Sequence, residues 1–329
     1  EGGLGPLEVW VKAVEEIHDP LTLTQFIATM ALYNRGALFS WMISVDGLHP
    51  THHMFEMIHT KLSLPGPGWY LNEGDKYTHR QELFRTRVSQ VFQMLGQGDE
   101  EAMEGARLVL AIETELAKHR LSGAYVRSHH AQRMTVQELS SLCPGIVWEA
   151  FFGALGLEGV GMAGNLTEGA LPGPTLAVQD VNNMQSLQEN VLDKFSPREL
   201  RAYLRWKVAR MYYKFLPHRF QKAVSYAMSP YDHPKMSTSP RWKGCYYTVV
   251  KALPEAASKL FVDAHFEGNV MSQAADMLMK VRDAFAHDLS DADWMDSTTR
   301  TRALNKLGAM GFEVGYPDGW GGAINSNPL

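Results

Sequence analysis

The sequence predicts a mainly α-helical protein that carries one small β-hairpin. Long stretches repeat apolar side chains every three to four residues, which is the spacing of an amphipathic helix. Two stretches begin with a capping box, in which side chains bond the free N–H groups of the first helical turn. A single pair of shorter runs, rich in strand-forming residues, accounts for the hairpin. These observations place the chain in the mainly α class, as a multi-helix domain.

The first helix and the hairpin lie near the start of the chain. An Asp-Pro pair precedes residues 21–34, where the apolar spacing predicts a helix. Residues 37–45 are rich in strand formers and end at Asp46-Gly47, which is a turn signal. Residues 54–62 form a second strand-like run. The two runs therefore predict one hairpin in an otherwise helical body.

The other predicted elements are helical. Thr135 with Glu138, and Ser196 with Glu199, form the two capping boxes. Pro197 takes the first helical position, where a missing N–H leaves no helical hydrogen bond unmade. After Pro197, a set of seven residues at helical spacing defines one apolar stripe, which we expect to face the core: Leu200, Tyr203, Leu204, Val208, Met211, Tyr212 and Phe215. The remaining helices are predicted over residues 75–95, 99–121, 272–289 and 297–310.

A segment rich in Gly and Pro, residues 157–178, predicts a long surface loop. Within it, Gly159, Gly161 and Gly164 match the GxGxxG pattern of dinucleotide-binding folds. That pattern binds pyrophosphate only when it follows a strand and opens a helix. Here a helix precedes it and an irregular sequence follows, so we predict a loop and no nucleotide site.

The composition is that of an ordinary globular protein. Of 329 residues, 45% are hydrophobic and 20% are charged, and the formal net charge is −5. This balance argues against a basic surface large enough to dominate nucleic-acid binding. No apolar stretch reaches the roughly 18 residues that span a bilayer. We predict one domain over residues 1–329. Because residue 1 is Glu, we also expect a processed or trimmed polypeptide without its targeting segment.

The two cysteines, Cys143 and Cys245, are too few to define a disulfide framework. One bridge, two free thiols and pairing with another chain all stay open. Neither cysteine has a recognisable catalytic neighbourhood, and the sequence contains no Gly-x-Ser-x-Gly nucleophile motif. Asn165-Leu166-Thr167 fits a glycosylation sequon, which matters only in a secreted protein.

A series of motifs along the chain is more specific than any of these patterns. Its first three motifs are residues 62–71 with Lys76-Tyr77; residues 112–117; and Met134-Thr135 with Leu139, Pro144-Gly145 and Trp148. The next two are the set Leu200, Tyr203, Leu204 and Trp206, and residues 240–243 with Cys245. The last two are residues 293–296 with Thr299, Ala303 and Lys306, and residues 315–320. The ordered series resembles the N-terminal, largely helical half of the neprilysin and endothelin-converting-enzyme family of zinc metallopeptidases.

The resemblance implies both a fold and a role. In that family a helical domain roofs the catalytic domain, encloses a large cavity and restricts access to small peptides. The zinc-binding half follows it, and the resemblance implies that this catalytic domain is absent from residues 1–329. It also suggests an extracytoplasmic or organellar location. The family cysteine that matches Cys245 pairs with an upstream cysteine that this chain lacks, so the resemblance implies an orphan thiol there.

The family holds its zinc with His-Glu-x-x-His and a later Glu, and the first Glu activates the metal-bound water. The sequence contains 13 His, and none is followed by Glu. We therefore expect a chain that is inactive alone, and whether it is part of an enzyme depends on another polypeptide segment. We assign no catalytic, cofactor-binding or metal-ligating residue and expect no cofactor in this chain.

One cluster is a candidate substitute for the missing metal site: His49, His52, His53, Glu56 and His59. On a helix, His52, Glu56 and His59 would share one face. On a strand, successive side chains alternate between faces and the set disperses. The local composition favours a strand, so we predict a solvated His-rich edge without a metal.

Two functions from different classes follow from the resemblance. The first is the substrate-enclosing, size-selecting part of a neprilysin-like zinc metalloendopeptidase, packed on its catalytic half. The second is a peptidase-derived accessory subunit that has lost catalysis and packs on substitute protein subunits of a larger assembly. Both predict that this polypeptide alone neither hydrolyses peptides nor binds zinc tightly, and neither includes a nucleic-acid partner.

Overall fold

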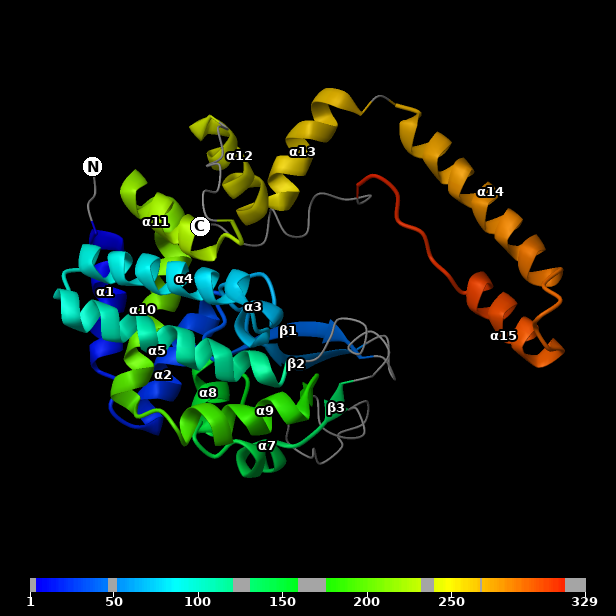
Figure 1. The fold of residues 1–329 in the computed structure, drawn as a ribbon. Helices are drawn as coiled ribbons and strands as arrows, with labels where there is room; N and C mark the ends of the chain where they lie inside the picture. The colour runs from blue at the N-terminus through cyan, green and yellow to red at the C-terminus, as the bar shows by residue number, and fades with distance from the viewer. Residues whose placement is uncertain are drawn as a thin grey trace. The chain divides into compact units, whose positions relative to one another are not determined.

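The computed structural model describes residues 4–46, 52–120, 131–158, 176–231, 240–266 and 268–316. The chain divides into two compact units, Glu1–Met236 (unit 1) and Ser237–Leu329 (unit 2). Figure 1 shows the order of their elements along the chain. The prediction of one domain over residues 1–329 stays a prediction.

Unit 1 combines helices with a small sheet. Its helices are α1 (Gly5–Glu15), α2 (Pro20–Leu32), α3 (Gly68–Leu71), α4 (Asp75–Met94), α5 (Asp99–Lys118), α7 (Val136–Leu142), α8 (Trp148–Ala154), α9 (Val181–Leu187), α10 (Pro197–Tyr212) and α11 (His218–Met228). A π-helical turn, Gln188–Leu192, follows α9, and a 3₁₀ turn, Tyr213–Phe215, follows α10. The mainly α class predicted from the sequence is confirmed.

The predicted hairpin is confirmed and belongs to a larger sheet. Strands β1 (Phe39–Val45) and β2 (His53–His59) pair antiparallel. In the described part of the chain the sheet has four strands, in the order β1-β2-β4-β3, and adds β3 (Gln132–Arg133) and β4 (Leu176–Val178). Strand β4 runs parallel to β2 and antiparallel to β3. Most of the predicted loop, including its GxGxxG pattern, lies outside the described residues. The predicted C-terminal end of this loop is wrong, because residues 176–178 form a buried strand.

The long helices α4 and α5 pack along each other, and α11 packs on α4 (Figure 1). Gly105 of α5 lies against α4, since a Cβ there would come within 2.8 Å of the Phe92 ring. The buried Arg80 side chain of α4 donates a hydrogen bond to the carbonyl oxygen of Tyr226 at 3.0 Å and another to that of Ala227. These carbonyls belong to the last turn of α11, where a cation complements the helix dipole.

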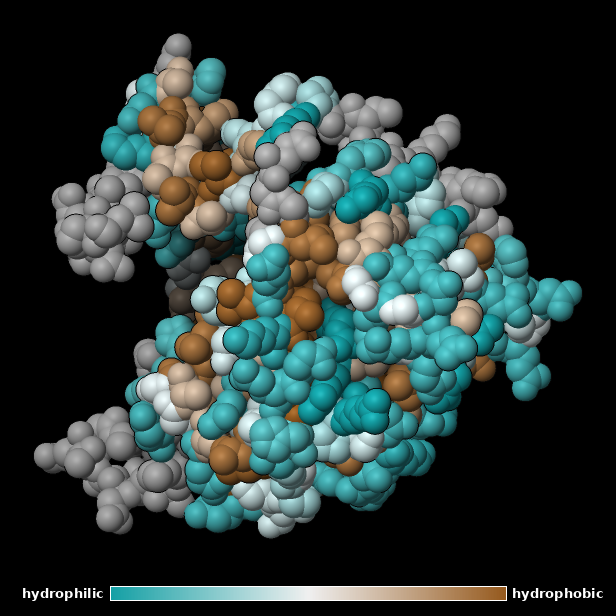
Figure 2. Space-filling model, turned by 90° about the vertical axis from the view of Figure 1, so that its left-hand side faces the viewer, coloured by the Kyte–Doolittle hydropathy of each residue, from teal (hydrophilic) through white to brown (hydrophobic). Residues whose placement is uncertain are grey.

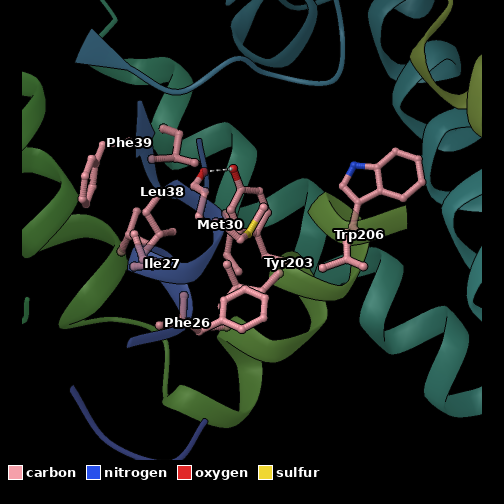
Figure 3. Close-up of a cluster of buried hydrophobic side chains, with 14 of the residues drawn as sticks. Phe26, Ile27, Met30, Leu38, Phe39, Tyr203 and Trp206 are labelled. Atoms are coloured by element: carbon pink, nitrogen blue, oxygen red, sulfur yellow. Dashed lines mark hydrogen bonds between the residues drawn. The ribbon is translucent and has the colours of Figure 1, made fainter. Parts of the chain in front are cut away.

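The core of unit 1 is built where α2, α8 and α10 meet the sheet. Figure 3 shows Phe26, Ile27 and Met30 gathered near Leu38 and Tyr203, all of them buried. The aromatic rings of α8 pack against the first two strands, and Phe39 lies 5.3 Å from both Trp148 and Phe151 between ring centroids. Such aromatic contacts add to the stabilisation from apolar burial.

The predicted helices form with ends that differ by a few residues. Both capping boxes are confirmed, at Thr135 for α7 and at Ser196 for α10. A third, unpredicted one opens α2, where Asp19 accepts a hydrogen bond from the Thr22 N–H at 2.7 Å. The apolar stripe of α10 is buried as predicted through Val208, but Phe215 is 62% exposed because the α-helix ends at Tyr212.

Replacing Ser196 by Ala is expected to lower the free energy of unfolding by about 1 kcal/mol, because the box then loses its side-chain acceptor. The Ser196 hydroxyl accepts from the Glu199 N–H at 3.4 Å, while the Glu199 carboxylate accepts from the Ser196 N–H at 2.8 Å. Urea denaturation measures the change. As a control, Ser141→Ala within α7 removes only a bond to the Gln137 carbonyl and should stay within about 0.5 kcal/mol of wild type.

Unit 2 consists of helices α12 (Arg241–Ala252), α13 (Pro254–His265), α14 (Val270–Ser290) and α15 (Ser297–Gly308). Helix α12 packs on α13 and α14 on α15. Gly315 has φ +75°, a left-handed conformation that favours glycine, and Met271 and Phe266 lie close to its backbone. The neighbouring Tyr316 ring packs edge-on against Phe266 at 5.6 Å. The Gly-Tyr of the last sequence motif thus fixes a turn; Pro317 and the residues after it lie outside the described residues.

Candidate functional site

A fully buried carboxylate, that of Glu113, lies at the centre of unit 1. It belongs to α5 and accepts three hydrogen bonds from the segment between β2 and α4. The Ser63 N–H and hydroxyl donate to it at 3.1 and 2.6 Å, and the Tyr70 hydroxyl donates at 2.5 Å. From α10, the Arg210 guanidinium lies 3.8 Å away. The carboxylate therefore ties three segments that are distant in the sequence, and we call this set the Glu113 cluster.

The remaining polar atoms of the cluster also have partners. The Ser63 hydroxyl accepts from the Trp206 indole N–H at 2.8 Å and from Arg210 at 3.0 Å. Arg210 donates a further bond to the Leu62 carbonyl at 3.2 Å. The Tyr70 hydroxyl accepts from a backbone N–H at 2.7 Å. Burial raises the pKa of Tyr70 well above its usual value, and the nearby Glu113 carboxylate adds to that increase. Tyr70 therefore stays a neutral donor.

Beside this cluster, Lys207 of α10 points into the core. Its ammonium nitrogen donates to the Thr60 hydroxyl oxygen at 2.9 Å and to the Lys61 carbonyl at 3.4 Å. The Thr60 hydroxyl in turn donates a hydrogen bond to the Ala37 carbonyl oxygen at 2.8 Å. The same carbonyl oxygen accepts a hydrogen bond from the Tyr203 hydroxyl. Desolvation, with a smaller contribution from the nearby Arg210 charge, lowers the pKa of Lys207 to about 7.

The geometry of these groups is that of a structural hydrogen-bond network and not of a catalytic site. Ser63 is 6% exposed, and its hydroxyl is a donor to a carboxylate instead of a nucleophile activated by His. Two surface pockets of about 630 and 290 Å³ occur in the described part of unit 1, and neither is lined by Glu113, Ser63 or Lys207. The buried cluster therefore holds α5 and α10 against the segment between β2 and α4.

The other motif residues are structural as well. The Trp148 indole N–H donates to the Cys143 carbonyl at 2.9 Å, which closes the turn between α7 and α8. The Asp296 carboxylate caps α15, because it accepts from the Thr299 N–H at 2.7 Å. Sequence reasoning identified these positions as motif residues but missed the role of Glu113. The available signal was a carboxylate on the apolar face of α5, four residues after Val109.

The His-rich segment folds as a strand, as predicted. The prediction of a solvated edge is wrong, because β2 pairs with both β1 and β4 as an inner strand of the sheet and His59 is half-buried. His53, Glu56 and His59 lie on β2, and alternation separates Glu56 from the two histidines. Burial, together with the charge of Arg120, lowers the pKa of His59 to about 4. Across the described residues, no three His, Cys, Asp or Glu side chains are placed to hold a metal ion. His49 lies outside the described residues.

Both cysteines are free thiols. Cys143 is buried beside α7, and burial raises the pKa of its thiol to about 12, so it is an inert core residue. Cys245 is exposed on α12. No helix in the described part of the chain combines the length and apolar character needed to cross a bilayer.

Comparison with known proteins bears on this architecture. Residues 1–317 match the model of a protein family described as peptidase family M13. Endothelin-converting enzyme 1 of Homo sapiens is 27% identical over 296 residues, a match that covers 88% of this chain and 36% of the human enzyme. The endothelin-converting enzyme homolog of Locusta migratoria is 26% identical over 294 residues and is covered to 39%. The chain thus spans little more than a third of these relatives.

Solved structures share the fold at lower identity. The zinc metalloprotease Zmp1 of Mycobacterium tuberculosis, in complex with an inhibitor, superposes with a TM-score of 0.77 at 18% identity, covering 93% of this chain and 45% of that chain. PepO from Lactobacillus rhamnosis superposes with a TM-score of 0.71 at 11% identity, covering 93% of this chain and 47% of that chain. At these identities the likeness establishes the fold alone.

Proposed function

Because the chain belongs to peptidase family M13, whose N-terminal domain its residues 1–317 match, we propose that it forms the helical, substrate-enclosing and size-selecting part of a zinc metalloendopeptidase. In this proposal the chain is not catalytic by itself. It forms a wall that admits short peptides and excludes folded proteins. The observation that carries the proposal is a family match over nearly the whole chain. It is combined with a sequence in which no His is immediately followed by Glu, as the zinc motif requires.

The described residues do not fit the zinc of the family. Strand β2 separates the carboxylate of Glu56 from His53 and His59, and no alternative ligand set occurs among the described side chains. Zinc is therefore proposed to bind to a different segment of the peptidase, and no step of hydrolysis is assigned to this chain.

A wall that sorts peptides by size has to resist deformation, and unit 1 has the interior for this. The Glu113 cluster joins α5, α10 and the segment before α4 through hydrogen bonds that involve a charged group. Hydrogen bonds of this kind are stronger than those between neutral groups. The cluster thus limits the relative motion of the helices that would bound a cavity.

Unit 2 supports packing against a second protein surface. Among its described residues only Leu289 and Leu307 are buried. Large apolar side chains are exposed along its helices: Trp242, Tyr246, Tyr247, Leu260, Phe261, Met277, Val281 and Phe285. On the face drawn in Figure 2, apolar residues gather in patches among hydrophilic ones. Extensive exposed apolar surface marks an interaction site, and we propose the catalytic half of the peptidase as the partner, outside the cytoplasm or in an organelle.

The purified chain is expected to contain substoichiometric zinc and to leave a fluorogenic peptide uncleaved, because its sequence has no His-Glu-x-x-His motif. Elemental analysis by mass spectrometry and a peptide-cleavage assay measure both. The matched control is the same chain joined to an M13 catalytic half, which should bind zinc and cleave a free peptide faster than the same peptide built into a folded protein. Stoichiometric zinc with hydrolysis by residues 1–329 alone would overturn the proposal.

A further inference from the structure

The larger surface pocket of unit 1, about 630 Å³ in volume, lies in the groove between α4 and α11. Its volume is in the range of pockets that take ligands. Its lining combines cations, amides and a small apolar floor: Arg87, Gln90, Gln93, Met94, Arg219, Lys222, Ala223 and Tyr226. None of these described lining residues is acidic, and three are cations; the Asp99 carboxylate lies at the rim, where it accepts a hydrogen bond from the Gln93 amide at 3.1 Å.

None of the three cations of this groove has a carboxylate partner among the described residues. In the described part of the chain, no ion pair involves Arg87, Arg219 or Lys222. Arg87 and Lys222 instead lie over one ring, that of Tyr226, each 5.6 Å from its centroid. Cation–π contacts hold the charged groups at the groove while leaving their charge uncompensated.

The position of Arg219 adds to this imbalance. The first turn of α11 contains His218 and Arg219 and no acidic residue. The N-terminus of a helix carries a partial positive charge, so cations there are placed against the helix dipole. Such a placement disfavours the helix, and a bound anion would compensate it.

The groove is elongated. Its lining follows one stripe on each helix, with Arg87, Gln90 and Met94 on α4 and with Arg219, Lys222 and Tyr226 on α11. Each stripe runs over about seven residues, or roughly 10 Å of helix. An extended peptide covers that length with about three residues.

We propose that this groove binds an extended acidic peptide segment, with Asp or Glu carboxylates paired to Arg87, Arg219 and Lys222. The amides of Gln90 and Gln93 can bond the peptide backbone, and Met94, Ala223 and Tyr226 contact its aliphatic parts. A single phosphate is a poorer match, because it would leave the amides of Gln90 and Gln93 and the apolar side chains of Met94, Ala223 and Tyr226 without a contact that a peptide segment can supply.

The test is fluorescence anisotropy with a rhodamine-labelled peptide of alternating Asp and Glu and with its Asn and Gln counterpart. We expect the acidic peptide to bind at least ten-fold more tightly than the neutral one. We also expect its affinity to fall as added salt screens the charges. Equal binding of the two peptides would overturn the proposal. So would tighter binding of the chain to phosphatidylserine vesicles than to the peptide.

Charge-altering variants test the position of the site. Arg219→Glu combined with Lys222→Glu is expected to reduce acidic-peptide affinity at least ten-fold while the Tm stays level or rises, because an acidic residue then lies in the first turn of α11. Arg219→Gln with Lys222→Gln gives the same loss without charge reversal. The matched control, Lys280→Glu with Arg302→Glu on exposed positions of α14 and α15, changes the net charge equally. An equal loss in that control would place the binding elsewhere and contradict the proposal.

Discussion

Replacing Glu113 by Ala is expected to lower the free energy of unfolding by about 3–5 kcal/mol, the cost of breaking a buried ion pair from one side. The variant leaves the Ser63 N–H, the Tyr70 hydroxyl and the Arg210 guanidinium without their shared acceptor. Each of these groups is buried or mostly buried, so each contributes a desolvation cost when its acceptor is lost.

Urea denaturation followed by tryptophan fluorescence measures this change, because Trp148 and Trp206 are fully buried in unit 1. A matched control lies two residues away on the same helix. Glu115 pairs with Lys118 at 2.9 Å and with Lys194 at 3.7 Å, and both lysines are exposed. Ion pairs to exposed lysines contribute little, so Glu115→Ala should cost about 1 kcal/mol, well below Glu113→Ala.

A more conservative variant separates charge from shape. Glu113→Gln retains the volume of the side chain but loses one acceptor and the negative charge opposite Arg210. We expect an intermediate loss of stability. If Glu113→Ala and Glu115→Ala were equally mild, or if Glu113→Gln matched wild type, the carboxylate would not hold unit 1 together.

The helices of this protein could be predicted from local patterns because their signals are local. The Ser196-Pro197-Glu199 start of α10 uses atoms within one turn, and the structure contains the hydrogen bonds that the letters predict. The hairpin was predictable for the same reason. Its register, with Phe39 opposite His59, joins runs that are close in sequence.

Elements that depend on distant partners were not predictable in this way. Strand β4 is three residues long and follows a run of Gly and Pro, so nothing local distinguishes it from a loop. It forms because it pairs with β2, in register from Phe55 opposite Leu176. The Glu113 cluster is similar, because the sequence alone does not bring Ser63, Glu113 and Arg210 together.

The prediction that this chain carries no zinc motif required no structure. A zinc motif is a pattern of adjacent letters, and its absence is visible in the sequence. The cationic groove was invisible at that level, because Arg87 and Arg219 are 132 positions apart in the printed numbering and meet only when α11 packs on α4.

Replacing Lys207 by Met is expected to remove a steep pH dependence of stability from unit 1. The pKa of Lys207 is about 7 in the folded chain, against a model-peptide value of 10.5. Between these two values the unfolded chain binds a proton that the folded chain does not bind. The free energy of unfolding therefore rises with pH through this window and falls as the pH drops toward 7.

The size of the effect follows from the width of the window. One pKa unit corresponds to about 1.4 kcal/mol, so the full window amounts to about 5 kcal/mol. Below pH 7 both states hold the proton, and the dependence ends. Above about pH 9 the thiol of Cys143 acts in the opposite direction, because burial raises its pKa and an unfolded thiol loses its proton first.

The measurement is therefore best made between pH 7.5 and 8.5, as the difference in urea stability between wild type and Lys207→Met. Over that unit the wild type should gain about 1 kcal/mol relative to the variant, because folded Lys207 is still partly protonated at pH 7.5. Lys61→Met is the matched control, since Lys61 is exposed and adjacent to the same Thr60; its slope should follow the wild type. Parallel slopes for all three proteins would mean that Lys207 keeps its proton in the core, and that Thr60 and the Lys61 carbonyl solvate an ammonium ion there.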